Sequence, residues 1–262
     1  MHTSTGKQTE RIYEKVLVSC FEIEQYQYLD KPVIRNYKRE ERKKKNNGEN
    51  KKKEKKTQTE KAQSSVSRTR KDIRRLVNSN PQLIKFLTLT TTSTDIGKMN
   101  REFKLFTQRM KAKDCFPDFQ YLSVPEFQKD IDFFGKVKPD GGAVHYHLLC
   151  NLPYVDQKKI AKIWGHGFIK IKRVSHVTNL GAYLCKYLQK DMHDKRMFGK
   201  KKFFCSQDLN RPIEITNEEA RKYMQDNSDN LKMTWEKTFN DEYRGEISYK
   251  VFHMKKRPRI IK

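Results

Sequence analysis

Long apolar runs are absent from this sequence of 262 residues. No stretch approaches the ~20 consecutive apolar residues that a transmembrane helix needs, so we expect no span of a membrane. The first residues, MHTSTGKQTER, also lack the apolar segment of a signal peptide. We therefore expect the protein to be cytoplasmic.

Paired cysteines and nucleotide-binding signatures are absent as well. The five cysteines are odd in number and far apart, and no CxxC pair occurs. This spacing supports neither a disulfide framework nor a zinc finger, and it is typical of reduced thiols. No Gly-Lys pair is followed by Ser or Thr, which excludes a P-loop of the GxxxxGK[ST] type within these residues.

Acidic residues are few beside the basic ones. The chain has 57 Lys and Arg against 32 Asp and Glu, which gives a formal charge of +25. Such an excess predicts a polyanionic partner, because each phosphate that a cation neutralises releases counterions. Membrane surfaces and acidic proteins are polyanions too, but the charge favours nucleic acid.

The basic residues concentrate in one segment. Residues 38–56 hold eleven Lys or Arg, four Glu and no apolar residue. A segment of this kind cannot bury enough surface to offset the entropy of ordering. We therefore expect residues 38–68 to be a basic, disordered linker that follows an N-terminal segment, residues 1–37. The linker is either an arm that touches DNA or a solvated connection, and the sequence does not decide between the two.

Apolar patterns further along the chain predict regular elements. We expect a short amphipathic helix in TRKDIRRLVNSNP (69–81). Strands are predicted over 83–92, 119–128, 142–152 and 168–174, and helices over 96–110, 155–167 and 178–192. The order β-α-β-β-α-β-α predicts an α+β fold, a ferredoxin/RRM-like antiparallel sheet with helices, over residues 69–213. Residues 214–262 are expected to add a helix near 216–226 and a hairpin near 232–252.

Two histidines in the run GAVHYHLLCNL are the first candidates for chemistry. His145 and His147 are two residues apart in a predicted strand, so their side chains share one face. Two imidazoles in this position can chelate one divalent metal ion. A carboxylate would suit Mg²⁺ or Mn²⁺ as the next ligand, and Glu126 near the end of the preceding strand is the first choice, with Asp130 and Asp132 as second choices. The alternative is a pair of core histidines bonded to their neighbours.

The helix GAYLCKYLQK holds the second set of candidates. Tyr183 and Tyr187 are four residues apart and therefore lie on one stripe of the helix. Lys186 and Lys190 each follow a tyrosine by three residues. A phenol has a pKa of ~10, and nearby ammonium groups stabilise the phenolate. The alternative is that both rings pack on the sheet with their hydroxyls in water.

Taken in order, these motifs resemble those of a known enzyme family. FLTLT (86–90), HYH (145–147) and AYLCKYLQK (182–190) are similar to the three motifs of HUH-type endonucleases that initiate rolling-circle replication. The likeness is to phage and plasmid Rep proteins, including the filamentous-phage gene II type and the two-tyrosine gene A type. It runs from about residue 83 to residue 213. Further matching pieces are VPEFQ (124–128), WGHGFIKI (164–171) and FFCSQDLNRP (203–212).

The resemblance implies a metal-dependent, site-specific single-strand DNA endonuclease and strand transferase. The predicted sheet would be the palm of the HUH nickase. In this family the histidine pair and the carboxylate bind Mg²⁺ or Mn²⁺ at the scissile phosphate, which here implies His145, His147 and Glu126. The implied partners are single-stranded origin DNA and the helicase and DNA polymerase of a bacterial host.

The resemblance also implies roles for the helix residues. Tyr183 or Tyr187 would attack phosphorus and leave a 5′-phosphotyrosyl bond with a free 3′-hydroxyl that primes synthesis. A second tyrosine allows a second cut while the first bond persists. Lys186 and Lys190 would stabilise phosphate charge. Which tyrosine acts first stays open, with a slight preference for Tyr183.

Two other readings of the sequence stay open. A transposase or relaxase would use the same nickase chemistry on a different DNA. A single-strand nucleic-acid-binding module without catalysis would instead need exposed aromatic rings on adjacent strands, for which Phe86, Tyr121 and Tyr146 are candidates. That alternative leaves the histidine pair and the tyrosine helix without a role.

Overall fold

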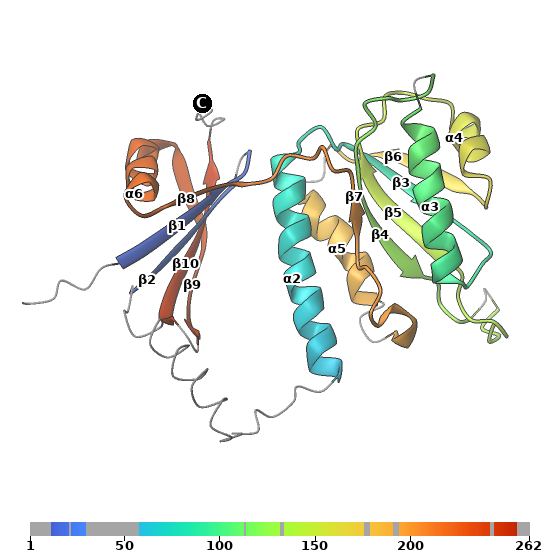
Figure 1. Cartoon of the computed structure of the whole chain (residues 1–262), viewed down its shortest axis with the longest axis horizontal. Coiled ribbons are helices and arrows are strands. Elements are labelled where there is room, and N and C mark those ends of the chain that lie inside the picture. Colours follow the sequence, from blue (N-terminus) through green and yellow to red (C-terminus); the bar gives the residue numbers. More distant parts are fainter. Residues whose placement is uncertain are drawn as a thin grey trace, which may run out of the picture. The chain divides into compact units, whose positions relative to one another are not determined.

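The computed structural model describes residues 12–20, 22–29, 58–112, 114–131, 134–175, 179–190, 194–241 and 244–255. The chain divides into two compact units (Figure 1). The central unit is Lys56–Arg211, and the terminal unit combines Met1–Lys55 with Pro212–Lys262. The lysine-rich residues 38–56, expected to be disordered, lie outside the described residues. None of the described helices is long and apolar enough to cross a membrane.

The terminal unit is a five-stranded antiparallel sheet with one α-helix among its described residues. Its strand order is β8-β1-β2-β10-β9. The strands are β1 (Ile12–Val18), β2 (Glu22–Leu29), β8 (Ile213–Thr216), β9 (Leu231–Asp241) and β10 (Gly245–Met254), and α6 (Asn217–Asp226) and the turn η2 (Ser228–Asn230) connect β8 to β9. The predicted helix near 216–226 and hairpin near 232–252 are confirmed. The two N-terminal strands pair with this C-terminal segment, which the sequence did not indicate.

The central unit contains the predicted α+β core. Its antiparallel sheet has the order β6-β3-β5-β4-β7. The strands are β3 (Lys85–Leu89), β4 (Tyr121–Phe127), β5 (Val144–Cys150), β6 (Ile169–Arg173) and β7 (Phe204–Cys205). The helices are α2 (Gln58–Ser79), α3 (Ile96–Met110), α4 (Gln157–Trp164), α5 (Leu180–Lys190) and the turn η1 (Lys195–Met197). The first four strands in chain order form the β-α-β-β-α-β arrangement expected of a ferredoxin-like sheet, so the α+β prediction is confirmed.

Local signals in the sequence explain where these helices begin and end. The Asp95 carboxylate accepts a hydrogen bond from the Lys98 N–H and caps α3. Asp156 caps α4 in the same way through the Lys158 N–H. Gly165 ends α4 in the left-handed conformation, which a glycine adopts without steric cost. These caps fix the helices that flank the sheet.

Two apolar layers cover the two faces of the central sheet. Alternate strand residues such as Leu87, Tyr146 and Leu148 form one buried cluster with α3 and α4. The intervening residues, such as Phe86 and Leu149, form a second cluster with α2 and α5. Because His145 and His147 alternate with Tyr146, they lie on the face that α2 and α5 cover.

Helix α2 is longer than its sequence predicted. It begins at Gln58, so it extends into the range 38–68 that was expected to be a linker. Its apolar residues are sparse, but Ile73, Leu76 and Val77 are buried against α5 and the sheet. Packing on a neighbouring helix stabilises the short apolar stripe, which the local composition alone could not show.

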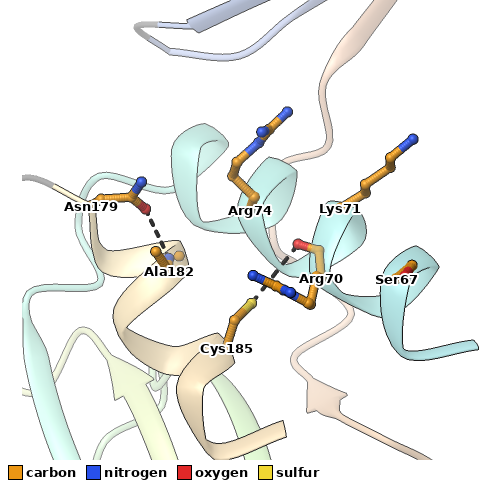
Figure 2. Close-up of a pocket in the computed structure, with 8 residues that line it drawn as sticks. Ser67, Arg70, Lys71, Arg74, Asn179, Ala182 and Cys185 are labelled. Carbon is orange, nitrogen blue, oxygen red and sulfur yellow. Dashed lines mark hydrogen bonds between the residues drawn. The ribbon is translucent and has the colours of Figure 1, made fainter. Parts of the chain in front are cut away.

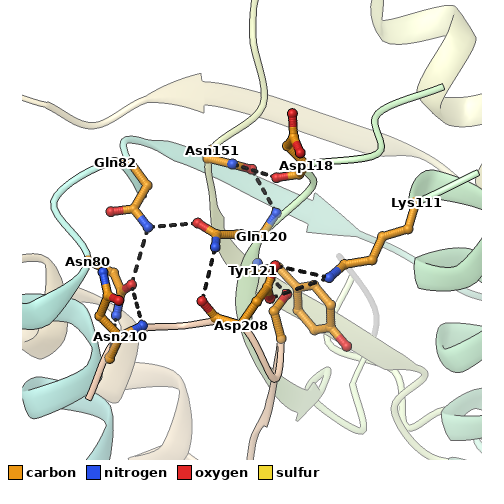
Figure 3. A network of polar contacts seen from close by, with 10 residues as sticks. Asn80, Gln82, Lys111, Asp118, Gln120, Tyr121, Asn151, Asp208 and Asn210 are labelled. Carbon is orange, nitrogen blue, oxygen red and sulfur yellow. Dashed lines mark hydrogen bonds and ion pairs between the residues drawn. The ribbon is translucent and has the colours of Figure 1, made fainter. Parts of the chain in front are cut away.

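A polar network ties several loop ends of the central unit together (Figure 3). The Asn80 side chain donates to the Asn210 carbonyl at 2.8 Å and accepts from the Asn210 N–H at 3.0 Å. Gln82 donates to Gln120 at 2.7 Å, and the Gln120 N–H donates to Asn151 at 2.8 Å. The network thus joins the end of α2 to the start of β4 and to the segment beyond β7.

Candidate active site

The register between β4 and β5 brings the predicted ligands together. Glu126 lies directly opposite His145 in the antiparallel pair. The long connection between the strands keeps this register, because the Gln128 N–H donates to the Ala143 carbonyl at 2.9 Å. Asp130 accepts from the Gly142 N–H at 2.6 Å and therefore stabilises the connection instead of facing the histidines. Asp132 lies outside the described residues.

The three polar side chains are nearly buried. The exposed fractions are 7% for Glu126, 9% for His145 and 6% for His147. The distance from His147 Nε2 to Glu126 Oε2 is 2.5 Å. On the other side of the ring, His147 Nδ1 is 3.4 Å from the Thr88 hydroxyl of β3. Neighbouring strands on both sides therefore orient the imidazole.

The surroundings of His145 favour its neutral form. Burial is the main cause that lowers its pKa, and the neighbouring His147 lowers it further, to about 4, although Glu126 acts in the opposite direction. At neutral pH the imidazole is unprotonated and keeps a nitrogen lone pair that can bind a cation.

Helix α5 lies over this cluster and contributes the tyrosines. The Tyr187 ring stacks on the His147 ring, with a centroid distance of 3.7 Å and an angle of 15° between the planes. Tyr183 meets the Phe86 ring edge-on at 5.0 Å and Tyr187 edge-on at 6.5 Å. Burial raises the pKa of Tyr187, and Tyr183 raises it further. Tyr187 is therefore a neutral phenol in direct contact with the histidine strand.

One lysine reaches both tyrosines. The Lys186 Nζ is 3.9 Å from the Tyr183 ring centre and 5.1 Å from the Tyr187 ring centre. Its ammonium group can stabilise negative charge that develops at either phenol oxygen. Lys190 is the last residue of α5, and its side chain lies outside the described part of the chain.

The donor set can be compared with the needs of a divalent metal ion. Two imidazoles and one carboxylate lie together at the strand face, and such donors suit Mn²⁺ and, through the carboxylate, Mg²⁺. In the described conformation Glu126 is bonded directly to His147. Within the described residues, no three His, Cys, Asp or Glu side chains are grouped so as to hold an ion. The residue types fit a divalent ion, which would take the place of the His147–Glu126 hydrogen bond.

The aromatic residues that a base-stacking platform would need lie in the core. Tyr146 is fully buried, and its hydroxyl donates to Asn100 at 2.7 Å. Phe86 is buried beneath α5, and Tyr121 is half-buried between Phe103 and Phe119. These three rings are therefore not available to stack on bases, contrary to what the binding-module alternative requires.

Comparison with known proteins bears on the same part of the chain. Residues 84–192 match the family model of the replication-associated protein ORF2/gene II protein. This match covers less than half of the chain but includes β3 to α5 and therefore all seven predicted site residues. No curated protein and no solved structure gave a significant match. The match supports a rolling-circle replication initiator and, with it, a function in DNA replication.

Two parts of the site were not predicted from the sequence. Thr88 and Phe86 alternate on β3 with buried aliphatic residues, and their positions next to His147 and the tyrosines follow only from strand pairing. The preference between the tyrosines also had no spatial basis in the sequence. The structure places Tyr187, rather than Tyr183, against His147.

Proposed function

We propose that this chain initiates rolling-circle replication of a plasmid or phage by nicking one DNA strand at an origin through a phosphotyrosine intermediate and later rejoining it. The contact between the Tyr187 and His147 rings carries the proposal, because it joins a nucleophile to the histidine–glutamate cluster. The match to the replication-associated family model over the same residues supports it independently.

The chemistry follows from the residues that meet in the cluster. Tyr187 Oη attacks the scissile phosphorus, a new O–P bond forms, and the bond from phosphorus to the 3′ oxygen breaks. The proton that the phenol loses is balanced by the proton that the 3′ oxygen gains. Bound by His145, His147 and Glu126, Mg²⁺ or Mn²⁺ would supply Lewis-acid polarisation of the phosphate. The covalent bond keeps the energy needed to rejoin the strand without ATP.

The second tyrosine and the lysines complete the proposed cycle. Tyr183 lies one helical turn from Tyr187 and makes a second cut while the first phosphotyrosyl bond persists. Lys186 stabilises the charge on phosphate or phenolate from its position beside both rings. Lys190 has the same spacing from Tyr187 as Lys186 has from Tyr183, and we assign it the same role.

The proposed substrate is single-stranded origin DNA. The formal charge of +25 favours binding to such a polyanion. No P-loop signature occurs in these residues, so we assign strand separation to a host helicase and extension of the 3′ end to a host polymerase.

A cleavage assay tests the proposal. The protein is incubated with single-stranded DNA from its own element's origin, with Mn²⁺ or with EDTA, and run on a denaturing gel. We expect a covalent protein–DNA adduct that needs the metal and is lost when Tyr183→Phe and Tyr187→Phe are combined. Tyr154→Phe, at a tyrosine that is 97% exposed, is the matched control and should form the adduct normally.

The alternative gives a different result in the same assay. A binding module without catalysis would hold the origin strand tightly, with or without metal, and form no adduct. Tight binding without any adduct on verified origin DNA would therefore reject the nickase.

A further inference from the structure

A pocket of about 340 Å³ lies between α2 and α5 of the central unit (Figure 2). It is lined from α2 by Ser67, Arg70, Lys71 and Arg74, which recur at helical steps of three and four and so share one face. Three of these four side chains are cationic. No acidic side chain is among the described residues that line the pocket.

The charges on the pocket wall are available to a ligand. Arg70 and Lys71 are exposed, and within the described part of the chain neither forms an ion pair with a carboxylate. Holding several like charges around one cavity is unfavourable unless an anion or solvent compensates them. A planar guanidinium beside a flexible ammonium is a combination that recognises phosphate groups.

The far wall of the pocket is the start of the tyrosine helix. Asn179, Gly181, Ala182 and Cys185 line it from this side, and Asn179 caps the helix by accepting from the Ala182 N–H at 2.8 Å. The positive end of the helix dipole adds to the cationic potential of α2. No Cβ separates Gly181 from α2, because an added Cβ would lie 3.0 Å from the Arg74 Cα. An anion in the pocket would therefore contact both helices where they pack most closely.

We propose that this pocket binds a phosphate of the DNA backbone and thereby anchors the substrate strand to the helix that carries the nucleophile. The proposal rests on the function proposed above, since it assigns a second contact to the same substrate. The tyrosines occupy the side of α5 that faces His147, whereas the pocket opens on the side that faces α2. The contact reads no bases and therefore adds affinity without sequence preference.

Charge removal gives the first test. Binding of a short single-stranded DNA oligonucleotide to the full chain is measured in EDTA, where no adduct forms, over a range of salt concentrations. Arg70→Ala combined with Lys71→Ala should weaken binding about tenfold on every sequence and reduce the salt slope by about 1. The matched control removes two exposed lysines from α4, Lys158→Ala with Lys162→Ala, and should change both quantities much less.

Charge insertion gives a second test that keeps every cationic group. Ala182 is exposed at the pocket wall, so a longer side chain is tolerated there. Ala182→Glu should weaken DNA binding severalfold, whereas Ala182→Gln, of the same shape, should not. Equal binding by these two variants, or equal losses in the α2 and α4 double variants, would overturn the proposal.

Two further readouts separate the possible ligands and the possible failures. If inorganic phosphate, at equal ionic strength with chloride, stabilises the wild type but not the α2 double variant against heat, and DNA binding is unchanged, the pocket takes free phosphate and the DNA assignment is wrong. If the wild type binds DNA through the pocket but never forms an adduct, the nickase is wrong and the pocket stands. If adducts form and the pocket variants bind normally, the reverse holds.

Discussion

At the scale of single residues, the Tyr187 ring connects the two halves of the candidate site. It stacks on His147 at 3.7 Å, and His147 is bonded to Glu126. The spacing of the histidines and of the tyrosines was predictable from strand and helix periodicity. The contact between the two pairs was not, because it depends on how α5 lies on the sheet.

Replacing Glu126 tests whether the cluster binds metal. Glu126→Gln keeps the shape of the side chain but removes the charge that a divalent ion needs, so we expect the Mn²⁺ concentration for half-maximal adduct formation to rise roughly tenfold to a hundredfold. Glu102→Gln is the matched control, because Glu102 pairs with His166 at 3.0 Å in another part of the unit. An unchanged metal requirement in Glu126→Gln would show that this carboxylate is not a ligand.

Asn80 tests the polar network independently of the chemistry. The residue is 1% exposed and bonds to Leu76, Gln82 and Asn210. Asn80→Ala leaves these groups without their partner, which should lower the free energy of unfolding by about 1–3 kcal/mol in a denaturant titration. Adduct formation well below the melting temperature should stay normal. A loss of activity in a fully folded variant would instead place Asn80 in the active site.

At the scale of elements, the β4–β5 connection determines whether Glu126 meets the histidines. A one-residue slip would move the carboxylate to the opposite face of the sheet. The loop and its turn were predicted, but the register was not, because it depends on hydrogen bonds such as those from Gln128 to Ala143 and from Gly142 to Asp130. Pairing of this kind is written in the backbone rather than in side-chain periodicity.

Gly142 tests the importance of this register. A Cβ at this position would lie 1.8 Å from the Gln128 carbonyl oxygen, so Gly142→Ala forces the connection apart. We expect a loss of about 1–3 kcal/mol in stability and a clear fall in adduct yield. Gly135→Ala, in the same connection but with open space around the Cβ, should cost about 1 kcal/mol for its left-handed backbone and leave the yield unchanged. Equal yields in the two variants would contradict this role of the register.

At the scale of the whole molecule, the two units differ in how far the sequence predicted them. Every strand and helix from β3 to α5 was predicted in order, because each has a clear apolar period and several have caps. The terminal unit was predicted only in its last third. Strands β1 and β2 pair with β8 and β10, which lie about two hundred residues away in the sequence, and local patterns do not indicate such pairing.

All the described site residues belong to the central unit, which makes it separable in principle. A fragment of residues 56–211 should fold cooperatively and form the metal-dependent adduct with single-stranded DNA. Circular dichroism with a thermal melt checks folding, and the gel assay checks activity. A folded fragment that forms no adduct would show that the terminal unit contributes to the reaction.

The central claim is that the tyrosine helix forms a covalent bond with DNA, and one measurement tests it most directly. Trypsin cleaves after Lys186 and thus separates Tyr183, in peptide 174–186, from Tyr187, in peptide 187–190. The adduct is digested with nuclease and trypsin, and the peptide that carries a nucleotide is identified by mass spectrometry. The structure predicts the nucleotide on Tyr187. A nucleotide on Tyr183 would contradict the assignment of the first nucleophile, and a nucleotide outside both peptides would contradict the claim itself.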